Sequence, residues 1–274
     1  MPEPVTSFVD GPRQRIAYRR TGTGQPLVLL HPLALSGAVW GAFADRLSED
    51  FDVIAADARG HGDSGWDGEP FSIDDLADDI AALLDGLDLP SAHVVGMSMG
   101  GSTAVSFAGR HPARADGLVL ADTTAWYGPD AAPTWEARAA SVVAQPRERQ
   151  VTFQVDRWFT EGFRQRNPRG VNRVVGIFLR TNSLAHAAAS RAMGAMDSRP
   201  LLSAITAPTL AVTGEEDYAT PPAMGKAIAD GVHGAEARVL PSLRHLSLVE
   251  DPGLAGLTAG FLYGAEAGTT GARA

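Results

Sequence analysis

Short apolar runs that alternate with helical patterns constrain the fold of this chain more than any other feature of the sequence. The runs occupy residues 27–30, 53–56, 93–95, 117–120 and 209–212, and turn residues bound each of them. Runs of this length predict buried strands, whereas apolar residues that recur every three or four positions between 73 and 87 predict a helix with Ser72 as its N-cap. Parallel strands need long crossover connections, so the alternation predicts an α/β fold with a mostly parallel central sheet and helices on both faces.

The alternation is interrupted at two places. Residues 7–10 and 13–19 lie too close together for a helix between them, and we expect an antiparallel hairpin that turns at Gly11-Pro12. After Leu120 the next strand pattern begins only beyond Pro208, which predicts a helical cap over residues 123–200, inserted between core segments 1–122 and 201–263. Residues 264–274 have almost no apolar bulk and predict a disordered tail.

Composition excludes several classes of function. The chain has no cysteine, so disulfides, thiolate nucleophiles and cysteine-bound metals are absent. A net charge of -9 disfavours nucleic-acid binding, which needs a basic surface. The sequence has neither a run of 18 apolar residues nor a signal-like start, so we expect a cytoplasmic protein with no membrane partner.

The charge is unevenly distributed. Residues 123–200 include eleven arginines and six acidic residues, so the predicted cap is basic although the chain as a whole is acidic. This pattern fits a module that attracts an anionic ligand. It also fits solvated arginines on exposed helices, and the sequence leaves both interpretations open.

A candidate nucleophile lies in the segment Gly-Met-Ser-Met-Gly-Gly at 96–101. The segment follows a predicted strand and precedes a helical pattern at 102–110, which is the context of a nucleophile elbow with Ser98 at its tip. Glycines suit such a sharp turn because side chains there would collide with the neighbouring strand and helix. The sequence therefore predicts Ser98 as the nucleophile.

A serine hydroxyl at neutral pH needs a histidine base that a carboxylate orients. Asp217 follows the predicted strand at 209–212 and His245 follows the predicted strand at 238–240, so both lie at the edge of the sheet where the elbow opens. Asp122, at the end of another strand, competes with Asp217 for the role of acid. Two other histidines, His31 and His61, also follow strands, and we expect them to line the pocket or hold loops.

Acyl transfer to a serine also needs N–H donors that stabilise the oxyanion of the tetrahedral intermediate. Met99 follows the nucleophile at a helix start, and Leu33 lies in the loop after the strand at 27–30, where Pro32 has no N–H to offer. We therefore expect the backbone amides of Leu33 and Met99 to form the oxyanion hole. The glycine-rich loop at 57–64 lacks the lysine of a phosphate-binding loop and is interpreted as structural.

Together the segments at 57–64, 96–101 and 214–217, with His245, resemble the α/β-hydrolase superfamily. The stretches at 121–124, 135–138, 157–160 and 245–250 further resemble the 3-oxoadipate enol-lactonases, although this chain has His31-Pro32 where that family's pattern has Asn-Ser, and Asp122 where it has Asn. The resemblance implies a triad of Ser98, Asp217 and His245 under a cap. It also implies no cofactor or metal, and a small ester or lactone substrate whose enol-lactone ring is opened in aromatic catabolism.

The resemblance also suggests where substrate binds. The lactone of that family carries a carboxylate, and Arg138, three residues from Trp135 on the same helical face, is our first choice to anchor it, with Arg157 second. Stacking of Arg138 on the tryptophan is the simpler alternative. The expected substrate-binding residues are His31, Trp126, Trp135, Arg138 and Trp158. Another lactone or ester, or a non-hydrolytic role as a cofactor-free peroxidase or ligand receptor, remains open.

Overall fold

A central sheet of eight strands organises the computed structural model, which describes residues 5–271 and side chains through Gly264. The strand order is β1-β2-β4-β3-β5-β6-β7-β8; β1 and β2 form the antiparallel hairpin, β2 also pairs antiparallel with β4, and all other pairs are parallel. The strands span β1 Thr6–Asp10, β2 Arg15–Thr21, β3 Gln25–Leu30, β4 Phe51–Ala56, β5 Ala92–Met97, β6 Ala115–Ala121, β7 Thr209–Gly214 and β8 Glu236–Leu240. The predicted α/β fold is confirmed.

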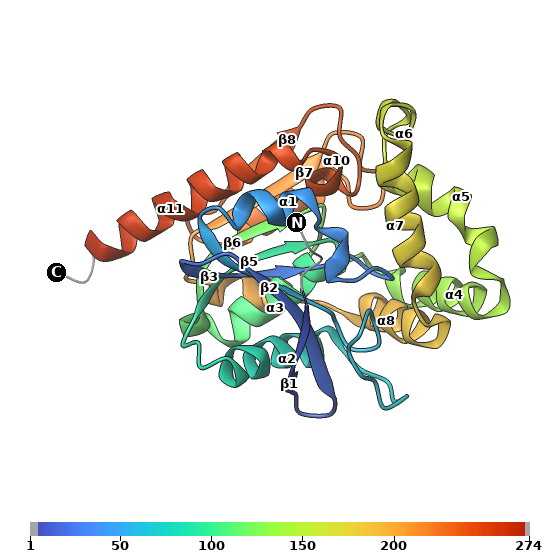
Figure 1. Ribbon diagram of the computed structural model, residues 1–274, viewed down its shortest axis with the longest axis horizontal. Helices are drawn as coiled ribbons and strands as arrows, with labels where there is room; N and C mark the ends of the chain where they lie inside the picture. The colour runs from blue at the N-terminus through green and yellow to red at the C-terminus, as the bar shows by residue number, and fades with distance from the viewer. Residues whose placement is uncertain (1–4, 272–274) are drawn as a thin grey trace.

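Helices lie on both faces of this sheet (Figure 1). The core helices are α1 Ala42–Leu47, α2 Ile73–Gly86, α3 Met99–Arg110, α9 Pro222–Gly231, α10 Ser247–Glu250 and α11 Ala255–Gly271. Alternate residues of each strand pack on opposite faces, as the pleat requires: Leu27 and Leu29 join the apolar layer that contains α1 and α11, while Val28 and Leu30 join the layer that contains α2, α3 and α9. The inner strands of the sheet, such as β4, β5 and β7, are therefore buried on both sides, whereas the edge strands β1 and β8 are largely exposed.

The helix predicted after Ser72 forms as expected. Ser72 accepts a hydrogen bond from the N–H of Asp75 at 3.1 Å, and the Asp75 carboxylate accepts one from the N–H of Ser72 at 2.7 Å. This reciprocal pair is a capping box, and it satisfies N–H groups that the first turn of a helix otherwise leaves without partners.

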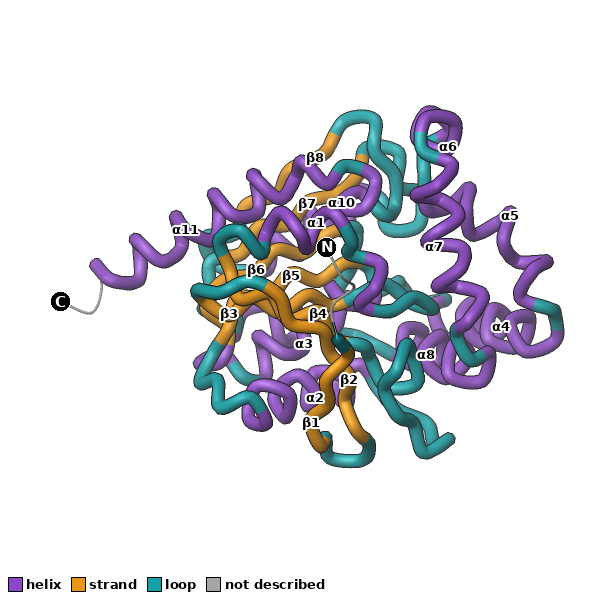
Figure 2. Tube along the Cα trace, viewed as in Figure 1, coloured by secondary structure: helices purple, strands orange, loops and turns teal. Residues whose placement is uncertain are grey.

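Five helices, α4 Ala131–Ala144, α5 Arg147–Trp158, α6 Glu161–Arg166, α7 Pro168–Arg180 and α8 Ser183–Ala195, lie between β6 and β7 in the chain. They gather beyond one end of the sheet (Figures 1 and 2). Their buried aromatic residues, such as Trp135 and Phe178, belong to the same apolar layer as α1 and α11. The helical insertion therefore shares its core with the rest of the molecule.

The C-terminal segment, residues 264–274, is the one for which the sequence predicts a disordered tail. Helix α11 continues to Gly271, and residues 272–274 lie outside the described part of the chain. Extending a helix that is already nucleated adds one hydrogen bond for each residue fixed, so the segment needs no apolar bulk of its own. No helix in the described residues is long and apolar enough to span a bilayer.

Candidate active site

Ser98 occupies the turn between β5 and α3 in a conformation that few side chains adopt, with φ 56° and ψ -119°. Its N–H donates to the carbonyl of Ala121 at 2.9 Å, which fixes the turn against the end of β6. A Cβ on Gly96 would collide with the carbonyl of Gly100, and a Cβ on Gly101 would lie 2.6 Å from that of Thr123. The glycines therefore permit the close approach of helix and strand that holds Ser98 at the tip.

The same packing brings the start of α3 beside the end of β3. A Cβ on Gly100 would collide with the carbonyl of Leu30, the last residue of β3. Met99 is the first residue of α3, where helix N–H groups have no intrahelical acceptor. Leu33 follows three residues after Leu30, and its N–H donates no hydrogen bond to any described residue. The two backbone amides predicted for the oxyanion hole thus belong to segments in direct contact.

The structure brings Ser98, His245 and Asp217 together. His245 Nε2 lies 2.9 Å from Ser98 Oγ, and His245 Nδ1 lies 2.9 Å from Asp217 Oδ2. Because a carboxylate only accepts hydrogen bonds, Nδ1 carries the proton and Nε2 is left to accept the serine proton. All three side chains are buried, with relative exposures of 5% for Ser98, 4% for His245 and 2% for Asp217.

Several donors hold the Asp217 carboxylate. Oδ1 accepts from the N–H groups of Ala219 at 2.8 Å and Thr220 at 3.1 Å, and Oδ2 accepts from the Thr220 hydroxyl at 2.8 Å. Burial by itself raises the pKa of Asp217, but the His245 imidazole and these hydrogen bonds outweigh burial and hold the pKa below its usual value. Sequence reasoning missed Thr220, although a hydroxyl residue three positions after an aspartate is typical of such a local turn.

Asp122, the rival candidate for the acid, faces different partners. Its Oδ1 accepts from the N–H of Gly214 at 2.9 Å, and its Oδ2 accepts from the N–H of Ser247 at 3.0 Å and from the Ser247 hydroxyl at 2.6 Å. Asp122 therefore ties the ends of β6 and β7 to α10, and it is Asp217 that meets the imidazole.

His31 differs from its predicted place among the substrate-binding residues. Its Nδ1 donates to the carbonyl of Pro32 at 2.7 Å and its Nε2 accepts from the N–H of Ala58 at 3.0 Å. Both ring nitrogens are therefore occupied by backbone groups, so His31 has no polar atom to offer a substrate. It joins the loop after β3 to the loop after β4, the second of the two roles considered for it.

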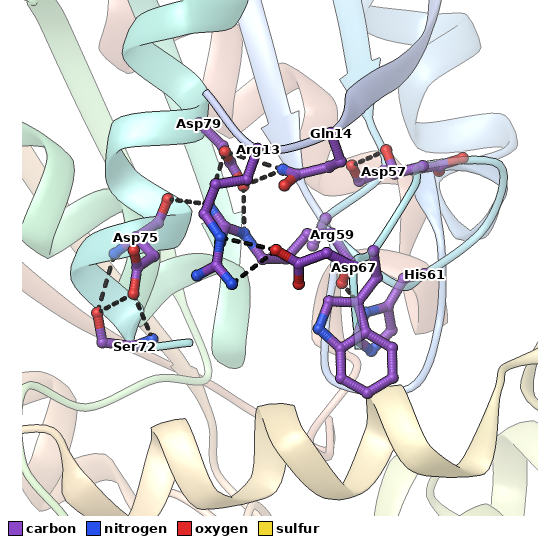
Figure 3. A network of polar contacts seen from close by, with 12 residues as sticks. Arg13, Gln14, Asp57, Arg59, His61, Asp67, Ser72, Asp75 and Asp79 are labelled. Atoms are coloured by element: carbon purple, nitrogen blue, oxygen red, sulfur yellow. Dashed lines mark hydrogen bonds and ion pairs between the residues drawn. The ribbon is translucent and has the colours of Figure 1, made fainter. Parts of the chain in front are cut away.

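His61 lies in the loop after β4, where its ring centroid is 5.4 Å from that of His31. Its Nδ1 donates to the carbonyl of Arg59 at 3.0 Å, and the Arg59 guanidinium forms a buried pair with Asp79 at 2.8 Å (Figure 3). Burial lowers the pKa of His31 to about 4 and that of His61 to about 3. The polar residues of this loop thus hold it against α2, as the structural interpretation expected.

A cavity of 540 Å³ lies between α4, α5 and the loop that follows Asp217. Arg138 and Arg157 both line it, and no ion pair joins either guanidinium to an acidic side chain in the described residues. Burial first, and then the charge of Arg157, lower the pKa of Arg138 to about 9. The Arg138 guanidinium also lies 4.7 Å from the centre of the Trp135 ring, so the predicted stacking and an accessible positive charge occur together.

The three tryptophans expected to bind substrate have different surroundings. Trp135 lines the cavity, and Trp158 is buried, with its carbonyl accepting a hydrogen bond from the N–H of Leu246, the residue after His245. Trp126 differs from the expectation. Its backbone bridges to Asp197 and its ring is covered by the Arg199 guanidinium at 3.6 Å, and none of its described contacts is with the triad.

Comparison with known proteins identifies the family. Residues 25–252 match the family model described as alpha/beta hydrolase fold. The chain belongs to the α/β-hydrolase fold family. It is 32% identical to a 3-oxoadipate enol-lactonase of Acinetobacter baylyi over 91% of this chain and 94% of that protein, so the chain is a hydrolase of this family with a lactonase relative.

Solved structures of other family members superpose closely. The enol-lactonase from Burkholderia xenovorans LB400 is 29% identical, with a TM-score of 0.89 over 94% of this chain and all of that one (100%). A thermophilic esterase from Thermogutta terrifontis is 28% identical, with a TM-score of 0.88 over 95% of this chain and 99% of that one. The family thus includes both lactone and ester hydrolases among the relatives of this α/β hydrolase.

Proposed function

We propose that this α/β hydrolase opens a lactone ring through an acyl-enzyme on Ser98, and that its substrate is 3-oxoadipate enol-lactone. The observation that carries the proposal is the chain of two hydrogen bonds, each 2.9 Å long, from Ser98 through His245 to Asp217. The name of the Acinetobacter relative supports the choice of lactone.

In the proposed reaction His245 Nε2 takes the hydroxyl proton as Ser98 Oγ attacks the lactone carbonyl. Asp217 keeps the imidazole in the tautomer that can accept this proton and stabilises the imidazolium that forms. The oxyanion of the tetrahedral intermediate accepts hydrogen bonds from the N–H groups of Leu33 and Met99. These donors are fixed before the reaction, so they stabilise the transition state without reorganising.

Collapse of the intermediate breaks the bond between the carbonyl carbon and the ring oxygen. His245 donates its proton to the leaving enolate oxygen, and the enol tautomerises to a ketone, which makes ring opening effectively irreversible. A water molecule, deprotonated by His245, then attacks the acyl-enzyme carbonyl, and the second collapse returns the proton to Ser98 Oγ and releases the free acid.

We place the carboxylate of the lactone in the cavity next to the loop that follows Asp217, anchored by Arg138 with Arg157 nearby. Two guanidiniums without acidic partners repel each other, and an anion between them relieves that repulsion. Trp135 and Trp158 would supply apolar surface for the rest of the substrate.

Hydrolysis of 3-oxoadipate enol-lactone, p-nitrophenyl acetate and a neutral butyrolactone, with Ser98→Ala as the blank, tests the proposal. We expect kcat/KM for the enol-lactone to exceed the others by about 10³ or more, which corresponds to about 4 kcal/mol at the transition state. Ester turnover without that preference would keep the Ser98 mechanism and reject this substrate. Inactivity on all three would favour a non-hydrolytic role, as would failure of a fluorophosphonate to label Ser98.

A further inference from the structure

The two residues that flank His245 are held by the helical insertion. The N–H of Leu246 donates to the carbonyl of Trp158 at 3.1 Å, and Arg244 Nη1 donates to the carbonyl of Asp156 at 2.7 Å. Both acceptors lie in the last turn of α5. The loop that carries the imidazole is therefore hydrogen-bonded on both sides of His245 to an element outside the core segments.

A buried carboxylate completes this connection. Glu250, at the end of α10, accepts hydrogen bonds from the Thr160 hydroxyl, from the N–H of Thr160 at 3.2 Å and from the N–H of Arg244 at 3.2 Å. Its relative exposure is 8%, and burial raises its pKa while the hydrogen bonds act in the opposite direction. A carboxylate this deeply buried needs these donors, so Thr160 and the His245 loop are kept at a fixed spacing.

The loop of the triad acid meets the same turn of α5. The Tyr218 hydroxyl, on the residue after Asp217, donates to Asp156 Oδ2 at 3.2 Å. Arg244 Nη2 donates to Glu216 Oε2, on the residue before Asp217, at 3.0 Å. Asp156 thus contacts neighbours of both Asp217 and His245.

We propose that three residues at the end of α5 position the His245 imidazole against Ser98. They are Asp156 and Trp158 in the last turn of α5 and Thr160 two residues beyond it, and we call them the α5 clasp. The clasp acts through hydrogen bonds to the loops that carry His245 and Asp217, and for Trp158 the bonded group is the backbone carbonyl. None of these hydrogen-bonding groups touches the reacting atoms, so in this role they position the imidazole. The inference rests on the proposed function, in which His245 is the base. A displacement of a reacting group by about 1 Å can lower the rate about a hundredfold, so hydrogen bonds that fix this loop have a direct effect on kcat.

The central test compares Thr160→Val with Thr160→Ser. Valine removes the hydroxyl that donates to Glu250 and caps α6, whereas serine keeps both interactions. We expect Thr160→Val to lower kcat about tenfold or more, with KM changed by less than about twofold. The reason is that alignment of His245 with Ser98 stabilises the transition state and does not contribute to substrate binding. Thr160→Ser should restore the wild-type kcat.

Glu136→Gln is the matched control. Glu136 forms a bidentate pair with Arg191 inside the insertion and contacts neither loop of the triad. A folded Thr160→Val protein with wild-type kcat overturns the proposal, and so does an equal loss of kcat in Glu136→Gln. If Thr160→Val fails to fold, Asp156→Ala replaces it, because the Asp156 side chain is 50% exposed and its removal disturbs the core little.

A measurement that needs no turnover separates this inference from the proposed function. The proton on His245 Nδ1 should give a far-downfield ¹H NMR resonance because it is hydrogen-bonded to Asp217. We expect the resonance to shift or broaden in Thr160→Val and to be unchanged in Thr160→Ser and Glu136→Gln. If the wild-type protein hydrolyses none of the esters, the proposed function fails, and an unchanged resonance in Thr160→Val separately overturns the role of the clasp.

Discussion

The carboxylate of Asp122 accepts a hydrogen bond from the backbone N–H of Gly214 at 2.9 Å, across the ends of two neighbouring strands. Its other oxygen accepts from the N–H and hydroxyl of Ser247. Gly214 is the last residue of β7, directly before the loop that carries Asp217, and Ser247 follows His245 by two residues. Asp122 therefore holds the two loops of the triad in place without itself contacting the imidazole.

Asp122→Asn should lower the free energy of unfolding by about 1–3 kcal/mol, the cost of an unsatisfied buried donor. Three donors face the two oxygens of Asp122, and an amide has only one oxygen, so its NH₂ group must face a backbone N–H in either orientation. Asparagine tolerates the φ of 49° at this position, so backbone strain does not contribute. Denaturant unfolding measures the change. Asp230→Asn, which removes an exposed pair with Lys226, is the control, and a fully stable Asp122→Asn protein would contradict the argument.

Asp217→Asn should lower kcat on p-nitrophenyl acetate about 10⁴-fold, as loss of the corresponding acid does in another serine hydrolase. The N–H groups of Ala219 and Thr220 both donate to Oδ1, so they keep the amide oxygen there and turn the NH₂ group toward His245. The imidazole must then accept at Nδ1 and carry its proton on Nε2, where it cannot take the proton of Ser98. A larger loss in Asp122→Asn than in Asp217→Asn would instead assign the acid to Asp122.

The sheet and the elbow could be predicted because each depends on a local pattern. Buried strands need short apolar runs, helices need a spacing of three or four, and the sharp turn at Ser98 needs glycines at Gly96 and Gly100. The positions of Asp217 and His245 follow from the fold, since parallel strands bring their carboxyl ends to one edge. These inferences need no knowledge of distant contacts.

The predictions that differ from the structure depend on partners far away in the sequence. Trp126 is a large aromatic residue of the kind that often binds substrate. Its backbone bridge to Asp197 and the contact of its ring with Arg199 depend on residues at the far end of the insertion. The Nε2 atom of His31 accepts a hydrogen bond from the N–H of Ala58, and no sequence pattern predicts a contact with a backbone group. Thr160 contacts Glu250, which lies ninety positions away in the chain, and no local sequence pattern predicts this contact.

Arg138→Ala should raise KM for the anionic lactone about tenfold and leave KM for p-nitrophenyl acetate unchanged, because only the anionic substrate loses a charge-assisted hydrogen bond. Arg138→Lys should restore part of the affinity, since it keeps the charge but not the planar donor pair. Steady-state kinetics on both substrates measure the split. Equal losses on both would mean that Arg138 only packs against Trp135.

Two buried histidines link stability to pH. The pKa of His31 is about 4 and that of His61 about 3, whereas both titrate near 6.5 in an unfolded chain. Below about pH 6.5 the unfolded chain therefore binds protons that the folded protein does not, so stability rises with pH. The stabilisation is fully present above about pH 6.5 and is lost as the pH falls toward 4 and then 3.

Replacing His61 by asparagine should flatten this acid dependence. The asparagine NH₂ group can still donate to the carbonyl of Arg59, but it has no proton to bind in the unfolded chain. Between pH 8 and pH 5 the wild type should lose about 2 kcal/mol more stability than His61→Asn. Denaturant unfolding at each pH measures the difference, with exposed His233→Asn as the control. The comparison uses the slope of the free energy of unfolding against pH and not the absolute stability of each variant. A His61→Asn curve parallel to the wild type would show that His61 gains a proton in the folded protein as readily as in the unfolded chain.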